Sequence, residues 1–331
     1  MTVGFDIESL ACQIREARGV AHKRDIDAVV ARLGVGSRHA AVPVGDDCAA
    51  IPDGGGHLLF AIEGFLDGFV AADPYFAGYC GIMVNLSDIA AMGGRPLAVV
   101  DALWSQDAAG ADPILAGLSD AAALYGVPVV GGHTNTRATS GNLAVAVLGR
   151  AGPHLLTSFD AAPGDDLVAA IDLRGRFREP HPYWDASTGS PGERLRDDLA
   201  LLPGLAEDGL CRSAKDISMA GVVGTALMLL ECSGVGGVID LDAIPRPPGV
   251  PLDRWLTAFP SFGYLLSVRP DRTPSVLARF AERGIAAAGI GRLDASRVAW
   301  VRGGAGDEAV VWDFVAGPLI GCGQDRAGAA S

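Results

Sequence analysis

Stretches with a helical period of apolar residues alternate along this chain with short apolar runs that are typical of buried strands. The helical period predicts helices over Asp6–Leu33, from about Tyr75 into residues 85–96, over Pro113–Tyr125 and over Val222–Glu231. The apolar runs predict strands at Leu58–Glu63, Ala98–Leu103, Val127–Val130, Leu143–Leu148 and Val168–Leu173. Strands that alternate with helices in both halves predict a mixed α/β fold.

A turn signal, Ala-Pro-Gly-Asp-Asp at Ala162–Asp166, separates two such patterns. We therefore expect two domains, residues 1–155 and residues 156–331. The segment Arg174–Pro191 is rich in proline, glycine and charge, and it predicts a long loop in the second domain.

Composition and charge narrow the classes of partner. The chain has 331 residues, of which 49% are hydrophobic, and a formal net charge of -13. A globular protein with ample core is expected, and a nucleic-acid partner is not, because no basic stripe exists to neutralise phosphates. A small phosphorylated ligand remains compatible with this charge, since acidic residues can bind one through bridging magnesium.

The six cysteines include no Cys-x-x-Cys pair, so neither a zinc site nor a disulfide framework is predicted. Cys12 is expected to be a small core residue. The first 18 residues lack the apolar centre of a signal peptide, and the longest apolar run, Val222–Leu230, is too short to span a bilayer. A cytoplasmic protein without a membrane partner is the expectation.

Acidic residues stand beside small residues in four stretches, Gly45–Asp47, Ala61–Gly68, Ser87–Asp88 and Lys215–Gly221. Asp88 is expected at the positive start of an apolar helix, as a cap or as a cation ligand. Asp216 or Ser218 could cap the helix Val222–Glu231. Each acid alone is an ordinary cap or turn residue. Together they offer enough oxygen ligands for two or more magnesium ions, as holding a triphosphate requires.

No Walker-type Gly-x-x-x-x-Gly-Lys-Ser/Thr sequence occurs, nor a kinase His-Arg-Asp set, a Gly-x-Ser-x-Gly or a His-Glu-x-x-His. If the chain uses ATP, it does so through acids and metal rather than through a P-loop.

Four motifs carry a resemblance: Gly45–Ala49, Asn85–Gly93, Gly131–Thr134 and Asp216–Ser218. In this order they resemble the aminoimidazole ribonucleotide (AIR) synthetase-like superfamily, which includes thiamine-monophosphate kinase and selenophosphate synthetase. The resemblance implies an N-terminal α/β domain that forms a β-barrel across a homodimer, and a C-terminal α/β sandwich. It also implies ATP and Mg²⁺ as cofactors.

The resemblance also implies roles for individual residues. Asp47, Asp88 and Asp216 are similar in position to metal ligands, and Asp88 and Asp216 to catalytic residues. The residues expected to contact the nucleotide are Asp46, Glu63, Gly131, Gly132, His133 and Ser218.

Three positions depart from thiamine-monophosphate kinase, the relative that the motifs resemble most. His133 and Met219 replace aspartates, and Ser158 stands where a nucleotide-binding arginine is expected. Selenophosphate synthetase needs a reactive cysteine near a lysine ahead of the Gly45 loop. Here only Cys12 and Lys23 precede that loop, inside helix-like sequence, so selenide chemistry is not expected.

The sequence thus predicts an ATP- and Mg-dependent phosphotransferase or ligase with its own, possibly phosphorylated, small-molecule acceptor. The acceptor is expected near Asp67, Phe69 and the loop that carries Arg176, Arg178, His181 and Arg194. Three alternatives stay open: a non-catalytic nucleotide-binding scaffold or partner subunit, an enzyme similar to selenophosphate synthetase, and a metal-dependent phosphohydrolase.

Overall fold

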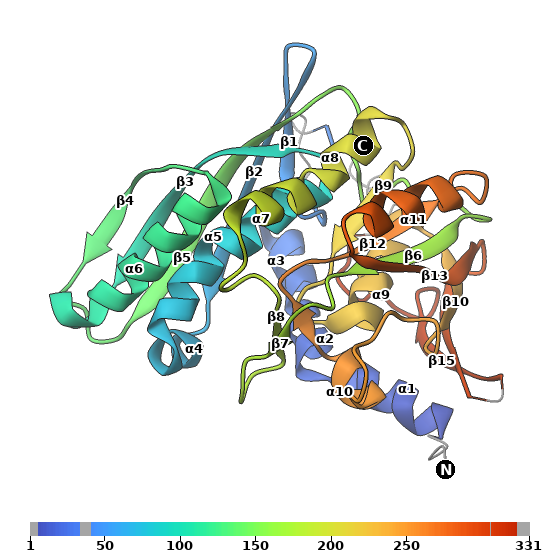
Figure 1. Cartoon of the computed structure of the whole chain (residues 1–331). Coiled ribbons are helices and arrows are strands. Elements are labelled where there is room, and N and C mark those ends of the chain that lie inside the picture. Colours follow the sequence, from blue (N-terminus) through green and yellow to red (C-terminus); the bar gives the residue numbers. More distant parts are fainter. Residues whose placement is uncertain (1–5, 34–40, 305, 323–331) are drawn as a thin grey trace. The chain divides into compact units, whose positions relative to one another are not determined.

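The computed structural model describes residues 6–33, 41–304 and 306–322, in two compact units (Figure 1). Unit 1 comprises Met1–Asp46, Leu156–Thr188 and Asp208–Ser331, and unit 2 comprises Asp47–Leu155 and Gly189–Glu207. The first segment of unit 2 ends at Leu155. The N-terminal segment belongs to unit 1, because Leu10, Ile14 and Val20 are buried in its core.

Unit 2 is built on a five-stranded sheet with strand order β1-β2-β5-β3-β4. Only β3 and β4 pair in parallel. In the described residues this sheet is open, and the predicted barrel is one that forms across a dimer. The elements are β1 (Ala49–Asp53), β2 (Gly56–Phe65), α4 (Asp67–Ala72), α5 (Pro74–Ala91), β3 (Arg95–Trp104), α6 (Ala108–Tyr125), β4 (Val129–Asn135), β5 (Asn142–Ala151), α7 (Gly192–Leu199) and α8 (Leu201–Glu207).

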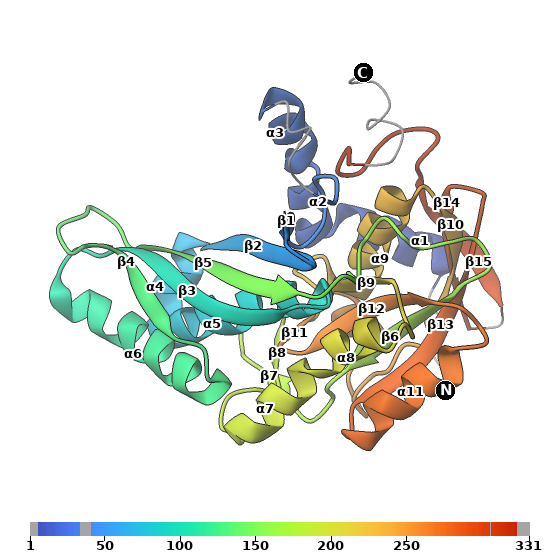
Figure 2. The same cartoon turned by 90° about the horizontal axis from the view of Figure 1, so that it is seen from above.

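The helices α5 and α6 lie side by side on one side of this sheet (Figure 2). α5 begins with Pro74, and the carboxylate of Asp73 caps it by accepting from the N–H of Phe76. The two helices touch at glycines: a Cβ on Gly78 would lie 2.0 Å from the carbonyl oxygen of Ile114, and one on Gly117 would lie 1.9 Å from that of Tyr75. This close approach buries α5 on nearly all sides.

The strand predicted at Val127–Val130 is only partly right. β4 begins at Val129, continues to Asn135 and is exposed along its whole length. It is the edge strand of the sheet. A short apolar run in the sequence does not show whether a strand lies at the edge or in the buried centre of a sheet.

Unit 1 contains a seven-stranded sheet, β15-β14-β10-β13-β6-β12-β9, and a three-stranded one, β11-β8-β7. Its helices are α1 (Ile7–Glu16), α2 (Arg18–Lys23), α3 (Asp25–Leu33), α9 (Gly221–Ser233), α10 (Leu252–Leu256) and α11 (Thr273–Glu282). Its strands are β6 (Asp166–Ile171), β7 (Arg176–Phe177), β8 (Tyr183–Asp185), β9 (Ser213–Asp216), β10 (Gly236–Asp240), β11 (Phe259–Pro260), β12 (Gly263–Val268), β13 (Ala286–Asp294), β14 (Val298–Gly303) and β15 (Asp307–Asp313).

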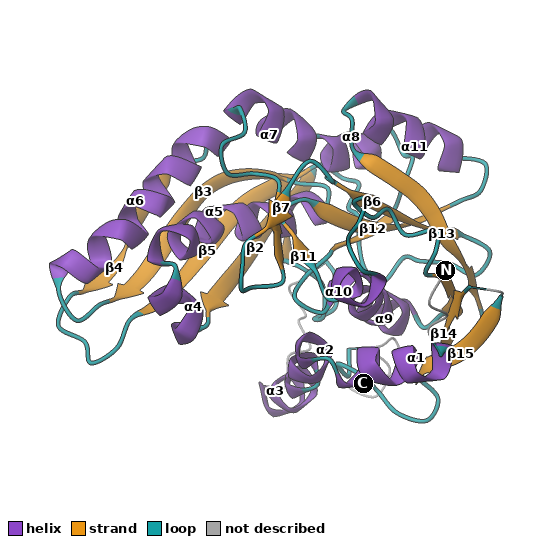
Figure 3. Ribbon diagram, turned by 60° about the horizontal axis from the view of Figure 1, so that its bottom comes forward, coloured by secondary structure: helices purple, strands orange, loops and turns teal. Residues whose placement is uncertain are grey.

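The central strands of this sheet are buried on both faces. α9 packs on one face, where Leu167 and Leu265 join the main core of the unit. α11 lies on the opposite side of β13, β6 and β12 and buries Val276 and Phe280 (Figure 3). The near-continuous apolar sequences of β6 and β12 reflect this double coverage.

Two predictions of local structure need correction. The expected helix over Asp6–Leu33 is three helices: Ala17 takes an extended conformation and separates α1 from α2, and Arg24 lies between α2 and α3. The expected loop Arg174–Pro191 contains β7 and β8, which pair with each other, and β8 also pairs with β11. The pairing of β8 with β11 joins residues far apart in sequence, which local composition does not reveal.

Candidate metal and nucleotide site

Asp88 lies in the last turn of α5, not at the start of a helix as the sequence analysis expects. Its side chain is buried, with 5% exposed. The carbonyl ends of a helix carry partial negative charge, so the macrodipole opposes a carboxylate here and favours a cation beside it. The prediction was wrong because residues 74–87 continue the same helix towards the N-terminus.

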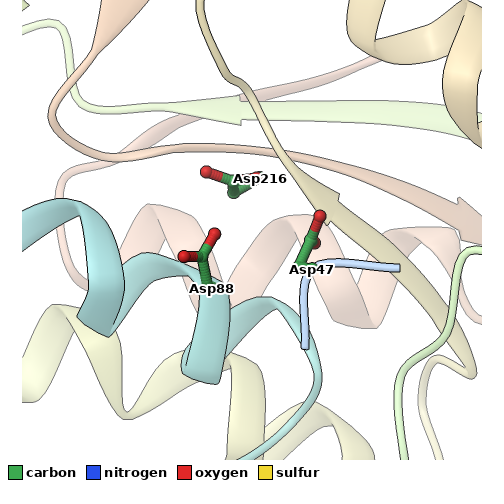
Figure 4. Close-up of side chains that lie close together, drawn as sticks. All are labelled: Asp47, Asp88 and Asp216. Atoms are coloured by element: carbon green, nitrogen blue, oxygen red, sulfur yellow. The ribbon is translucent and has the colours of Figure 1, made fainter. Parts of the chain in front are cut away.

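Asp47 provides a second carboxylate close to Asp88. One oxygen of each side chain lies within 4.8 Å of the other, a separation that one cation could bridge. Figure 4 shows the Asp88 side chain rising from α5 and the Asp47 side chain from the loop that precedes β1. Two carboxylates with hard oxygen ligands suit Mg²⁺, and so unit 2 holds a candidate magnesium site.

In unit 1, Asp216 ends β9 and pairs with Tyr264 of β12. Figure 4 also labels this residue. Asp216 and the preceding Lys215 are each 5% exposed. Neither Asp216 nor Ser218 caps the following helix, because the N-cap of α9 is Ala220 and no side chain bonds there. The Ser218 hydroxyl oxygen is buried and has no hydrogen-bond partner among the described residues.

Asp46 is bonded inside unit 1. Its carboxylate accepts the backbone N–H of Ser158 at 2.8 Å and the Ser158 hydroxyl at 2.7 Å. Lys215 Nζ lies 3.5 Å from the same hydroxyl oxygen, to which it donates. Ser158 is fully buried, so it cannot take over the surface contact of an arginine.

The remaining predicted nucleotide residues lie on the sheet of unit 2. Glu63 of β2 pairs with Val145 of β5, which pairs with Asp101 of β3, and Asp101 pairs with Gly132 of β4. These positions form one row across the sheet. A Cβ on Gly132 would lie 2.5 Å from the Asp101 carboxylate, which explains the glycine.

His133 is exposed on β4, with its ring centroid 6.2 Å from that of Trp104. Gly131 precedes this row on the same edge strand. The described residues of unit 2 therefore place these two predicted contacts on the sheet edge, whereas Asp88 lies on the covering helix.

Sequence reasoning missed two polar groups in unit 2. Burial raises the pKa of Asp101, whose Oδ1 has no hydrogen-bond partner among the described residues. Asn85 is fully buried, and its Oδ1 likewise has no partner in the described part of the chain. The spacing of Asn85 and Asp88, three residues apart on one helix, is a signal that they share a face.

The loop arginines expected at the acceptor are mostly held in ion pairs. Arg178 lies 3.5 Å from Asp185. Arg194 lies in α7, not in the loop as predicted, and is 3.9 Å from Asp198 of the same helix. Arg176 is exposed and forms no ion pair with the described residues. It is therefore the loop arginine best suited to meet a ligand.

Cys12 is exposed on α1, so its predicted place in the core is wrong. The neighbouring positions Leu10, Ala11 and Ile14 supply the buried side of this helix. Cys12 lies outside the apolar stripe that these residues form, so its side chain faces solvent.

Comparison with known proteins now decides the family. The family model described as AIR synthase related protein, N-terminal domain, matches residues 45–151, and the C-terminal model matches residues 190–301. This chain belongs to the AIR synthase-related family. The resemblance drawn from the motifs and the two-domain α/β fold are confirmed.

Two curated proteins illustrate the range of the family. An uncharacterized protein of Synechocystis is 45% identical over 320 residues, which cover 95% of this chain and 98% of that protein. A thiamine-monophosphate kinase of Synechococcus elongatus is 26% identical over 272 residues, which cover 72% of this chain and 81% of the kinase.

Among solved structures, Thermotoga maritima PurL complexed with ADP is similar, with a TM-score of 0.75 and 20% identity. The match covers 95% of this chain and 52% of the PurL chain, so this chain spans about half of that protein. At this identity the likeness shows the fold. Within the described residues, no helix is both long and apolar enough to cross a membrane.

Proposed function

We propose that this protein is an ATP- and Mg²⁺-dependent enzyme that transfers a phosphoryl group to a small-molecule acceptor. The observation that carries the proposal is the pair of carboxylates Asp47 and Asp88, with Asp88 buried at the negative end of α5. A bound magnesium ion would neutralise both acids and could hold the phosphates of ATP. Relatives that are named as a kinase or solved with ADP support this chemistry.

Asp216 is proposed as the third metal ligand and, with Asp88, as a catalytic residue. Connections within unit 1 support this role: Asp46 bonds Ser158, Ser158 bonds Lys215, and Lys215 precedes Asp216. Asp47 follows Asp46 directly in the chain. These bonds run from the residue before Asp47 to the residue before Asp216.

Nucleotide contacts are proposed for the hydroxyl of Ser218 and for Asp46, Glu63, Gly131, Gly132 and His133. The best supported is Ser218, because a buried hydroxyl without a protein partner costs free energy unless a ligand bonds it. The acceptor is proposed to be a small molecule, phosphorylated or not, that meets Arg176.

A homodimer is proposed from the second face of the unit 2 sheet. This face exposes Phe60, Ile62, Val100 and Leu148, which are between 37% and 66% exposed. A contiguous apolar face of this kind marks an association surface. Pairing of two such sheets would give the barrel that the family resemblance implies.

A scaffold that binds nucleotide without catalysis is the second candidate. It is favoured by one observation: Ser158 is fully buried and bonded to Asp46, so the position aligned with a nucleotide-binding arginine makes no contact of that kind. Steady formation of ADP with any acceptor would exclude it.

The test is calorimetric titration of a non-hydrolysable ATP analogue, with and without magnesium, on the wild type and on Asp88→Asn. Magnesium-dependent binding that disappears in the variant supports the proposal. Binding that is equally tight in both proteins, or absent from the wild type, would overturn it.

A further inference from the structure

Three consecutive residues at the end of α9, Glu231, Cys232 and Ser233, each bond a different segment of unit 1. The Cys232 thiol donates to the carbonyl oxygen of Gly45 at 3.7 Å. The Ser233 hydroxyl donates to the carbonyl oxygen of Ser158 at 2.7 Å. Gly45 precedes Asp46 in the chain, and Ser158 is the residue to which Asp46 is bonded. The end of α9 therefore bonds both residues that hold Asp46 in place.

Glu231 holds the C-terminal segment Leu319–Cys322 in place. Its carboxylate accepts three backbone N–H groups, from Leu319 at 3.1 Å, Ile320 at 2.7 Å and Gly321 at 3.0 Å. Glu231 is 6% exposed, and burial raises its pKa despite these bonds. A buried acid with three donors fixes this backbone tightly.

The held segment places Cys322 against Gly45. A Cβ on Gly45 would lie 2.4 Å from the Cβ of Cys322, and the φ of Gly45 is +125°. Glycine is therefore required on two grounds, its backbone conformation and the closeness of Cys322. The next two residues of the chain are Asp46, bonded to Ser158, and Asp47.

We propose that Glu231 is a positioning residue for the magnesium site. It holds Leu319–Cys322 against Gly45, and this contact fixes the position of the Asp47 carboxylate. The inference rests on the proposed function, because it takes Asp47 as a metal ligand. It assigns a role to a carboxylate that belongs to none of the acidic motifs.

The test uses the full chain with Glu231→Gln, which keeps the size of the side chain but turns an amide NH₂ towards the N–H of Ile320. Two quantities are measured: the magnesium concentration that gives half-maximal binding of a non-hydrolysable ATP analogue, and the rate at which iodoacetamide modifies Cys322. We expect the magnesium midpoint to rise about 10- to 100-fold, as for other residues that orient metal ligands. Cys322 should react faster.

The matched control is Glu308→Gln. Glu308 is an exposed acid of the same unit, paired with Arg302 at 2.8 Å. It should change neither quantity. A second variant, Gly45→Ala, brings a methyl group against Cys322 and leaves Glu231 intact. It should raise the magnesium midpoint as well, and an unchanged midpoint would overturn the inference even if Glu231→Gln does not fold, because Gly45 would then not position Asp47.

The possible failures are distinguishable. If Cys322 reacts faster but the magnesium midpoint is unchanged, the segment does not position Asp47 and the inference is overturned. A raised midpoint with Cys322 still protected would overturn it too, since Glu231 would act by another route. If the wild type itself shows no magnesium-dependent binding, the proposed function fails, and the inference fails with it.

Discussion

Ser158 donates both its backbone N–H and its hydroxyl to the two carboxylate oxygens of Asp46, at 2.8 and 2.7 Å. The serine is fully buried, and Lys215 donates to its hydroxyl as well. The replacement of an expected arginine by serine therefore has a structural meaning. The buried serine anchors Asp46, the residue before Asp47.

Ser158→Ala removes the hydroxyl and leaves the backbone bond. Because buried Ser158 then loses its side-chain hydrogen bond to Asp46, we expect the free energy of unfolding to fall by about 1–3 kcal/mol. Magnesium-dependent nucleotide binding should weaken as well. Urea denaturation and calorimetry measure the two effects. Ser296→Ala, in an exposed turn of the same unit, is the control and should leave both values unchanged. If the two variants had the same free energy of unfolding and bound the nucleotide equally well, Ser158 would not anchor Asp46.

Asp88→Asn should separate stability from function. Without magnesium its melting temperature should be no lower than that of the wild type, because the charge removed lies at the negative end of α5. Adding magnesium and a nucleotide analogue should raise the melting temperature of the wild type but not of the variant. Asp53→Asn removes an exposed acid paired with Arg150 and should keep the ligand effect. If magnesium and the nucleotide analogue also raise the melting temperature of Asp88→Asn, Asp88 is not a metal ligand.

The sequence predicts more of the fold than of the site's geometry. The strand predicted at Leu58–Glu63 lies within β2, and the motif order was sufficient for the family. Asp88 was assigned to a helix start, because Ser-Asp is typical of a helix cap, although its helix begins at Pro74. The role of Ser158 depends on Asp46, which is 112 positions away. No local pattern encodes such a pairing.

Burial raises the pKa of Asp101, so the folded state favours its protonated form. The stability that this neutral form contributes is complete below the ordinary aspartate pKa of about 3.9 and is lost as pH rises through the raised pKa. Asp101→Asn mimics the neutral acid. Its free energy of unfolding relative to the wild type should therefore be higher at pH 7.5 than at pH 4.

Urea denaturation of both proteins at the two pH values checks this difference. Asp112→Asn, which changes an exposed acid on α6, is the control and should show a smaller dependence on pH. A relative stability of Asp101→Asn that does not change with pH would contradict the raised pKa.

The thiols should differ in reactivity. Cys12 is exposed, whereas Cys211 is buried and its pKa is raised to about 12. Only the thiolate is alkylated, so iodoacetamide at pH 8 should modify Cys12 in the native protein and leave Cys211 intact until the protein is unfolded. Peptide mass spectrometry measures both. Cys12→Ser should remove the fast reaction, and early modification of Cys211 would contradict its burial.

Ile62→Glu tests the apolar face of the unit 2 sheet. Ile62 is 66% exposed, so a glutamate there costs little in an isolated chain. In a homodimer formed through this face, the same change would bury an unpaired charge. We expect the variant to be a folded monomer, while the wild type is a dimer by light scattering. Val315→Glu is the matched control, because Val315 is 69% exposed but belongs to unit 1. It should stay dimeric, and a dimer of Ile62→Glu would show that association uses another surface.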